Sequence, residues 1–221
     1  MNIKNNITKL LQNLPEGCKL IAVSKTHPST LIQEAYDAGQ RHFGENRVQE
    51  LESKHRELPK DIAWHMIGHL QSNKVKYIAP FVSLIHSVDS VKLLDEINKQ
   101  GARIQRIIPC LLQIHIAEEE TKFGFSEAEV LELLGGEHLT TLHHINIVGL
   151  MGMATFTDHT EQIRKEFKHL KALFERIRSM SIQGPVHMQE LSMGMSSDYA
   201  IAIEEGSTMI RIGSAIFGTR Q

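Results

Sequence analysis

Lys25 follows a short apolar segment, Leu20–Ser24, and precedes a helix-like segment near Ser29 and Thr30, whose hydroxyls are typical helix caps. In a chain of alternating strands and helices, the residue after the first strand lies where such folds carry out their chemistry. The most specific reaction of a lysine there is a Schiff base with an aldehyde. Most lysines after a strand are simply solvated, so Lys25 needs support from other residues.

Two segments combine glycine with small hydroxyl residues after predicted strands. Ser192–Asp198 includes Gly194 and Ser196, and Thr208–Gly218 includes Gly213. Backbone N–H groups at the start of a helix bind anions, and barrels often build a phosphate site after strands seven and eight. Each segment alone also fits an ordinary turn into a capped helix. Together they favour a phosphate site.

Arg211 is the last polar residue of the predicted eighth strand. A buried arginine is costly unless its guanidinium meets an acceptor. The sequence allows two kinds of partner for the Arg211 guanidinium. One is a structural ion pair inside the barrel, with Glu45 as a candidate, and the other is a ligand.

The composition predicts a soluble globular protein. The chain has 221 residues, 41% of them hydrophobic and 23% charged, which suits one α/β barrel. A net charge of −2 provides no basic surface for nucleic acid, and no signal peptide or membrane span is visible. Cys18 and Cys110 are far apart, as expected for reduced thiols in the cytoplasm.

The 13 histidines do not have the spacing of a metal site. His65 and His69 lie four residues apart, but they straddle a predicted strand end and a glycine, so helical geometry cannot bring them together. We therefore expect no metal.

Apolar runs and amphipathic segments alternate along the chain. The predicted strands are Leu20–Ser24, Arg41–Gly44, Ile62–Ile67, Val82–Ser87, Ile107–Ile116, Ile145–Met151, Val186–Leu191 and Thr208–Ile212. The predicted helices between them are Thr30–Gly39, Arg47–Glu57, Gln71–Ala79, Val91–Gly101, Glu127–Leu134, Thr160–Met180 and Ser197–Gly206. Eight strands predict a single α/β domain over residues 1–221, a (β/α)8 TIM barrel with an extra leading helix within residues 1–15. Pro109 is expected at the start of strand five, because a closed barrel has no edge strand to accommodate it.

Several motifs, in a fixed order over nearly the whole chain, identify a family. They are Ala22–Thr26, Phe43–Glu50, Trp64–Lys74, Gly149–Met151, Ser192–Ser196, Arg211–Gly213 and Ile216–Gly218. They resemble the signature of the pyridoxal phosphate homeostasis proteins, the YggS/PROSC family. The resemblance implies a barrel of PLP-binding type, like the N-terminal domain of alanine racemase, with pyridoxal 5′-phosphate (PLP) as cofactor.

The resemblance also implies a role for each matching residue. These roles are the Schiff base for Lys25, a place near the ring and lysine for Asn46, contact with the pyridine nitrogen for Arg211, and phosphate binding for Ser192, Gly194, Ser196 and Gly213. The aldehyde, the phosphate and the ring nitrogen of PLP would each have a partner.

An arginine at the pyridine nitrogen leaves that nitrogen unprotonated, which weakens the ring as an electron sink. The chain also ends at Gln221, without the C-terminal β domain that supplies a second acid/base group in alanine racemase. We therefore expect a cytoplasmic PLP carrier without catalytic residues, a monomer or weak dimer, with apo PLP-dependent enzymes as candidate recipients.

Two alternatives stay open. One is a small fold-type III PLP enzyme, such as a racemase or an aldol-cleaving enzyme, that uses Tyr199, His65 or another residue of the barrel mouth as its second base. The other is an unrelated barrel that binds a sugar phosphate.

Overall fold

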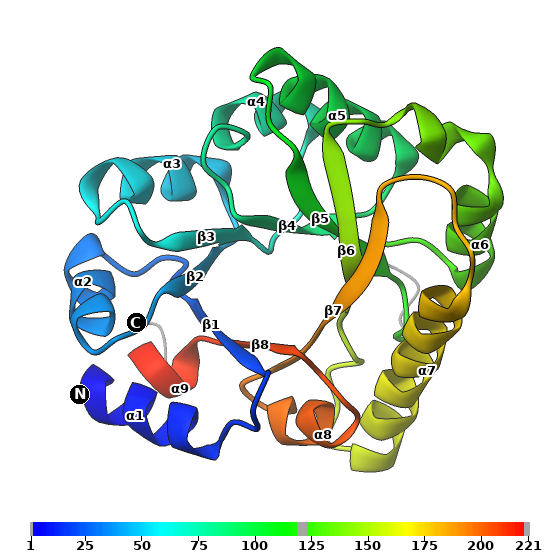
Figure 1. The fold of residues 1–221 in the computed structure, drawn as a ribbon. Helices are drawn as coiled ribbons and strands as arrows, with labels where there is room; N and C mark the ends of the chain where they lie inside the picture. Colours follow the sequence, from blue (N-terminus) through cyan, green and yellow to red (C-terminus); the bar gives the residue numbers. More distant parts are fainter. Residues whose placement is uncertain (1, 119–122, 219–221) are drawn as a thin grey trace.

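Eight parallel strands close into a barrel in the computed structural model, which describes residues 2–118 and 123–218 (Figure 1). Each strand pairs with the next along the chain, and β8 pairs with β1. The strands are β1 Lys19–Val23, β2 His42–Glu45, β3 Ala63–Met66, β4 Leu84–Val88, β5 Ile108–Ile114, β6 Ile145–Gly152, β7 Val186–Met195 and β8 Met209–Ile212. The predicted (β/α)8 fold is confirmed. The chain end at Gln221, on which we based the expected lack of a second domain, lies outside the described residues.

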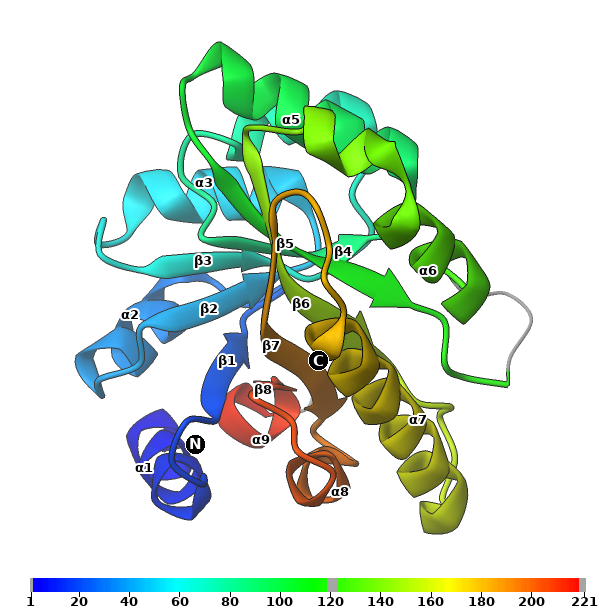
Figure 2. The same ribbon diagram turned by 45° about the vertical axis from the view of Figure 1, so that its right-hand side comes forward.

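Helices surround the barrel on its outer side (Figure 2). They are α1 Ile3–Asn13, α2 Ser29–Asp37, α3 Val48–Glu57, α4 Val75–Ile78, α5 Val91–Arg103, α6 Glu127–Gly135, α7 Thr160–Ser179, α8 Tyr199–Glu204 and α9 Ser214–Phe217, with 3-10 turns η1 Ser72–Lys74 and η2 Glu137–Thr141. The leading helix α1 packs beside α9, where the Asn6 side-chain amide donates to the Ile216 carbonyl at 3.0 Å. The first and last helices are thus joined.

Local boundaries differ from the prediction at α2. The expected N-terminal cap by Ser29 or Thr30 is wrong. The residue at the N-cap position is Pro28, which has an extended backbone, and no side chain forms a capping hydrogen bond there. Ser29 already lies inside the helix, and its hydroxyl donates to Glu57 of α3 instead. Pro109 is the second residue of β5, as expected.

β7 is longer than predicted, and this difference affects the site. The prediction ended the strand at Leu191, because the small and polar residues that follow are typical of a loop. β7 continues to Met195, with an irregular register against β8 between Ser192 and Met195. Gly194 has φ +95° there, and a Cβ on it would lie 2.6 Å from the Ala202 Cβ of α8. The backbone conformation and the close approach of α8 both require glycine.

The hydrophobic core has two parts. The larger part lies between the strands and the helices and contains Phe43, Trp64 and Phe167, all with no exposed surface. A smaller cluster consists of Ile21, Leu84, Leu111, Met151 and Met209.

Two buried histidines are joined by a hydrogen bond within the structure. His65 Nδ1 and His86 Nε2 are 2.9 Å apart. Burial lowers the pKa of His65 to about 3 and lowers the pKa of His86 well below its usual value. Both imidazoles are therefore neutral at pH 7.

We expect the free energy of unfolding to fall as the pH is lowered from about 6.5 toward 3, because the unfolded chain takes up protons that the buried histidines exclude. The folded pKa values lie below the unfolded ones, so this stabilisation is complete above the unfolded pKa and is lost below it. Each histidine contributes a slope of up to about 1.4 kcal/mol per pH unit. Urea unfolding at about pH 7 and about pH 5 measures this slope.

The matched control uses one buried and one exposed histidine. His65→Asn should reduce the slope, whereas His187→Asn, at an exposed position, should keep the slope of the unsubstituted protein. Equal slopes in all three proteins would contradict the buried neutral state of His65.

Candidate functional site

A cavity opens at the carboxyl ends of the strands. Its volume is about 560 Å³, well within the usual range of about 300–1,000 Å³ for small-molecule sites. Five of the seven residues predicted for the site line it, namely Lys25, Asn46, Ser196, Arg211 and Gly213. We call it the mouth cavity. Barrel closure brings these residues together from both ends of the chain.

Lys25 and Asn46 follow neighbouring strands, β1 and β2, and so reach the same edge of the barrel. Gly68 makes this arrangement possible, because a Cβ on it would lie only 2.5 Å from the Asn46 carbonyl oxygen. The side chains of Val23, Ile67, Met153, Phe156 and Met195 form an apolar wall of the same cavity. Lys25 itself is half-buried beside this wall, and partial removal of an amine from water favours its neutral, nucleophilic form.

A buried ion pair supports the backbone just before Lys25. The Lys54 ammonium of α3 donates to the Ser24 carbonyl and to Glu45 Oε1, both at 2.8 Å. The Ser24 hydroxyl donates to the same Glu45 oxygen at 2.6 Å. Burial raises the pKa of Glu45, and the charge of Lys54 opposes that rise. Glu45 therefore pairs with Lys54, and its proposed pairing with Arg211 does not occur.

The residue after Lys25 has an unusual backbone. Thr26 has φ +67°, a region that a β-branched residue rarely adopts. Its N–H donates to Glu50 Oε2 at 2.8 Å, and the Lys54 ammonium lies 3.3 Å from that oxygen. Burial would raise the pKa of Glu50, but the Thr26 N–H and Lys54 together lower it. The chain is thus held on both sides of Lys25.

Sequence reasoning did not identify this role of Glu50 and Lys54. Their four-residue spacing predicts an ion pair on α3, and the structure contains it. The spacing does not reveal that the pair also binds the backbone of Ser24 and Thr26, because that contact depends on how α3 packs against the barrel.

Arg211 is 4% exposed and borders the mouth cavity. One of its terminal nitrogens donates to Ser192 Oγ at 2.6 Å, and the other donates to the Gly152 carbonyl at 3.0 Å. Burial lowers the pKa of Arg211 to about 10, while Asp198 opposes that shift. The guanidinium remains charged at pH 7.

Ser192 and Gly194 do not lie where the sequence prediction put them. Both belong to β7 itself, and neither is among the residues that line the mouth cavity. Ser192 has no exposed surface, and its hydroxyl bonds to Arg211 and to His86 Nδ1. Its position fits a partner of Arg211 better than a phosphate ligand.

Three serines contribute hydroxyl groups to the mouth cavity. They are the predicted Ser196 together with Ser197 and Ser214. The Gly213 N–H donates to Ser196 Oγ at 3.4 Å, which joins the turn after β7 to the turn after β8. Both added serines stand in the segments that favoured a phosphate site, so the sequence already contained their signal. Hydroxyl and backbone N–H groups of this kind can hold an anion.

The two bases suggested for an enzyme do not reach the mouth cavity. His65 is buried and bonds to His42 and His86. Tyr199 belongs to α8 and is not among the residues that line the cavity.

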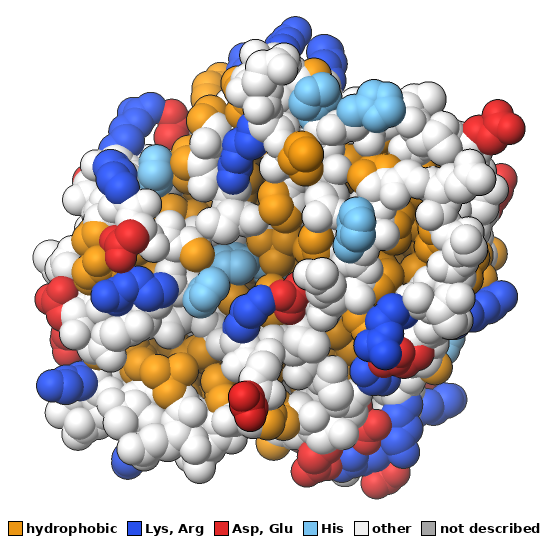
Figure 3. Space-filling view, in the orientation of Figure 1, with side chains coloured by type: hydrophobic (Ala, Val, Ile, Leu, Met, Phe, Trp, Pro, Cys, Tyr) orange, Lys and Arg blue, Asp and Glu red, His pale blue; other side chains and the backbone are white. Residues whose placement is uncertain are grey.

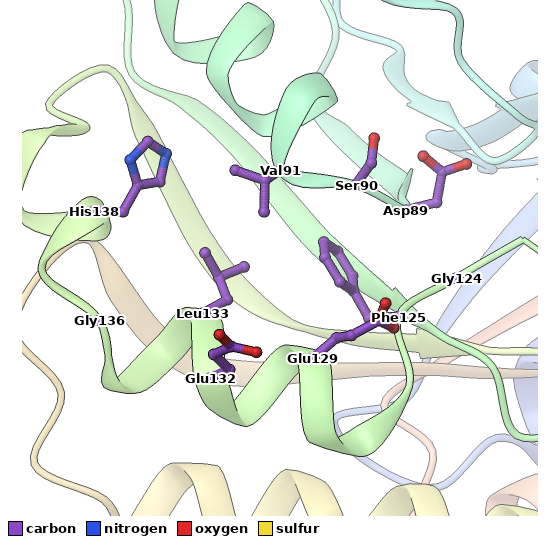
Figure 4. Close-up of a pocket in the computed structure, with 10 residues that line it drawn as sticks. All are labelled: Asp89, Ser90, Val91, Gly124, Phe125, Glu129, Glu132, Leu133, Gly136 and His138. Carbon is purple, nitrogen blue, oxygen red and sulfur yellow. The ribbon is translucent and has the colours of Figure 1, made fainter.

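A second cavity of about 470 Å³ lies between the start of α5 and the length of α6, and its lining extends to His138 of η2 (Figure 4). Its lining includes the carboxylates of Asp89, Glu129 and Glu132, and no described residue that lines it is a lysine or arginine. Because an anion would meet unfavourable charge there, the mouth cavity is the better candidate for a phosphate ligand.

Within residues 2–118 and 123–218, no three His, Cys, Asp or Glu side chains are grouped so that they could hold a metal ion. In the same part of the chain, no helix has the length and apolar character needed to cross a membrane.

Known proteins resemble this chain in both sequence and fold. The family model of the alanine racemase N-terminal domain matches residues 1–221. The pyridoxal phosphate homeostasis protein of Aquifex aeolicus is 36% identical, and the match covers 100% of both chains. The protein of that name from Escherichia coli is 38% identical over 93% of this chain and 87% of its own length.

Solved structures agree with these matches. PipY of Synechococcus elongatus without PLP has a TM-score of 0.91 and 38% identity, covering 98% of this chain and 100% of its own. The same protein with PLP bound has a TM-score of 0.87 at the same identity and coverage. Alanine racemase of Clostridium difficile has a TM-score of 0.75 at 15% identity, covering 99% of this chain and 56% of its own, and supports the fold alone. The resemblance inferred from the sequence motifs is confirmed, and the chain belongs to the pyridoxal phosphate homeostasis protein family.

Proposed function

We propose that the protein binds PLP in the mouth cavity, holds it on Lys25 and releases it to apo PLP-dependent enzymes in the cytoplasm. The observation that carries this proposal is the lining of one cavity by an amine, a buried guanidinium and a turn rich in hydroxyl groups. These groups match the aldehyde, the ring nitrogen and the phosphate of PLP. PipY, a structural relative at 38% identity, is known with PLP bound.

The amine of Lys25 forms the covalent link. Its nitrogen adds to the aldehyde carbon, and the carbonyl oxygen leaves as water. The contacts of Ser24 and Thr26 fix the backbone on both sides of the lysine, which lines the cavity. Asn46, directly after β2, lines the same cavity as Lys25 and lies near the ring.

Ser196, together with the backbone around Gly213, binds the phosphate. Ser197 and Ser214 add hydroxyl groups on the same cavity. Ser192 supports Arg211 instead, because both of its hydrogen-bond partners lie among buried residues.

Arg211 faces the pyridine nitrogen and makes the protein a carrier without turnover. Arginine has donors only, so it cannot accept a proton from the ring or hold one there as a carboxylate would. An unprotonated ring is a poor electron sink. A tightly held but chemically inactive cofactor suits storage and delivery.

We expect a pyridoxyl group on Lys25 after borohydride reduction of the PLP-loaded protein, because reduction makes the imine bond permanent. Peptide mapping by mass spectrometry locates the label. Lys25→Arg should abolish the label, whereas Lys19→Arg, at the opposite end of β1, should leave it unchanged. A label mainly on another lysine would disprove the assignment.

Ser196→Ala should weaken PLP binding about tenfold to hundredfold, because a hydrogen bond to a charged acceptor contributes about 1.5–3 kcal/mol. Pyridoxal, which lacks the phosphate, should bind almost as before. Ser192→Ala is the matched control, and it should weaken both ligands alike through Arg211. Fluorescence titration with each ligand measures the affinities of both variants and of the unsubstituted protein. Equal losses for both ligands in Ser196→Ala would mean that Ser196 only supports the fold.

The PLP-loaded protein should exchange the α-hydrogen of alanine no faster than free PLP does, because an unprotonated ring stabilises a carbanion only poorly. Deuterium incorporation, followed by NMR for the unsubstituted protein and Lys25→Ala, measures this exchange. Exchange that depends on Lys25, with a turnover of about 1–10³ per second, would favour the small-enzyme alternative.

A further inference from the structure

A chain of hydrogen bonds crosses the interior of the barrel. His42 Nδ1 lies 3.1 Å from His65 Nε2, and His65 Nδ1 lies 2.9 Å from His86 Nε2. His86 Nδ1 then lies 2.9 Å from Ser192 Oγ, which accepts from Arg211 at 2.6 Å. We call His42, His65 and His86 the histidine chain. It links three adjacent strands, β2 to β4, to β7 and β8 across the barrel.

The two ends of this connection open at opposite ends of the barrel. Arg211 borders the mouth cavity. His42 is half-buried and lines a cavity of about 210 Å³ at the amino ends of the strands, together with Lys19 and Glu190. Histidine, basic and acidic side chains meet at the centre of the face shown in Figure 3. A hydrogen-bonded path therefore runs from one end of the barrel to the other.

The positions of the hydrogens follow from Arg211. A guanidinium can only donate, so Ser192 Oγ must accept from it. The hydroxyl hydrogen of Ser192 then points to His86 Nδ1, the other partner of that oxygen. Each imidazole in turn carries its hydrogen on Nε2 and donates to the Nδ1 of the next. His86 donates to His65, and His65 donates to His42.

The reverse donor direction along the histidine chain leaves one more hydrogen-bonding group without a partner. If each imidazole carried its hydrogen on Nδ1, Ser192 would receive hydrogens from both Arg211 and His86. Its own hydroxyl hydrogen would then have no acceptor among the contacts of the described residues. A buried donor without a partner costs about 1–3 kcal/mol, so the direction set by Arg211 is favoured.

The neutral state of His65 and His86 agrees with this direction of the hydrogen bonds. A neutral imidazole has one donor and one acceptor, and the chain uses both in His65 and His86. Burial lowers the pKa of both residues far below neutrality. Burial and Lys19 also lower the pKa of His42, but the carboxylate of Glu190 opposes that shift. His42, being half-buried, is the member best placed to gain a proton.

We propose that the histidine chain is a positioning device that orders Ser192 and Arg211 and transmits the protonation state of His42 to the mouth cavity. A proton added to His42 Nδ1 would face the hydrogen on His65 Nε2. His42 then keeps hydrogens on both nitrogens, and relief requires His65 and His86 each to move its hydrogen from Nε2 to Nδ1. The change ends with His86 donating to Ser192, which alters the acceptor of Arg211. The groups that face His42 and tune this step are Lys19 of β1, Glu190 of β7 and His65 of β3. The effect on bound cofactor rests on the proposed function, whereas the coupling itself does not.

The experiment uses 15N NMR of the imidazole and guanidinium groups in the full protein without PLP, followed between about pH 5 and about pH 8.5, the range in which histidine changes charge. We expect His65 and His86 as neutral Nε2–H forms at the upper pH. We also expect the Arg211 signal to shift with the midpoint at which His42 titrates.

Three variants separate the coupling from a general pH effect. His42→Gln keeps an oxygen that can accept from His65 but cannot titrate, so the Arg211 shift should be lost. Ser192→Ala should uncouple Arg211 while His42 still titrates. His187→Gln, at an exposed position bonded to Asn146, should leave the Arg211 shift unchanged.

Nδ1–H forms of His65 and His86 at the upper pH would overturn the proposal. A pH-dependent Arg211 shift that persists in His42→Gln would also overturn it. The same holds if the Arg211 signal in the unsubstituted protein does not change with the midpoint at which His42 titrates. A separate titration with PLP tests the proposed function. If PLP fails to bind, that function falls while the imidazole and guanidinium signals still decide the coupling.

Discussion

The buried guanidinium of Arg211 is the constraint from which much of the barrel interior follows. A permanent charge with five donors and no acceptor stands at 4% exposure beside apolar side chains. It is tolerable only where acceptors surround it. Ser192 and the Gly152 carbonyl supply two of them, and a ligand in the mouth cavity is well placed to supply another. Ser192 in turn needs a partner for its hydroxyl, and His86 provides it.

The lysine side of the cavity is organised differently. Lys25 is positioned through its backbone neighbours by a buried ion pair that lies outside the barrel wall, between β2 and α3. Thr26 has an unfavourable backbone conformation, and in this conformation its N–H donates a hydrogen bond to Glu50. Strain of this kind persists where the surrounding structure over-determines it, as it commonly does at binding sites. The backbone beside Lys25 and the guanidinium of Arg211 are thus held by different sets of hydrogen bonds.

The sequence indicated the parts of the site that depend on strand order. Lys25, Asn46 and Arg211 follow from their places at the ends of predicted strands, because closure of a parallel barrel brings such ends together. Ser192 was assigned to a loop because a small polar residue close to a glycine is typical of one, whereas its hydroxyl bonds to Arg211 inside the barrel. The histidine chain could not be predicted, since its members are far apart in sequence and meet only after the barrel closes. The same reason applies to Lys54, whose contact with Ser24 depends on helix packing.

The state of the pyridine nitrogen is the point on which storage and catalysis differ. PLP labelled with 15N at that nitrogen, bound to the protein, reports it directly through its NMR shift at neutral pH. We expect the shift of an unprotonated ring that accepts a hydrogen bond from Arg211, and a move toward the protonated value in Arg211→Glu. A protonated ring in the unsubstituted protein would contradict the proposed role of Arg211 in keeping the cofactor chemically inactive.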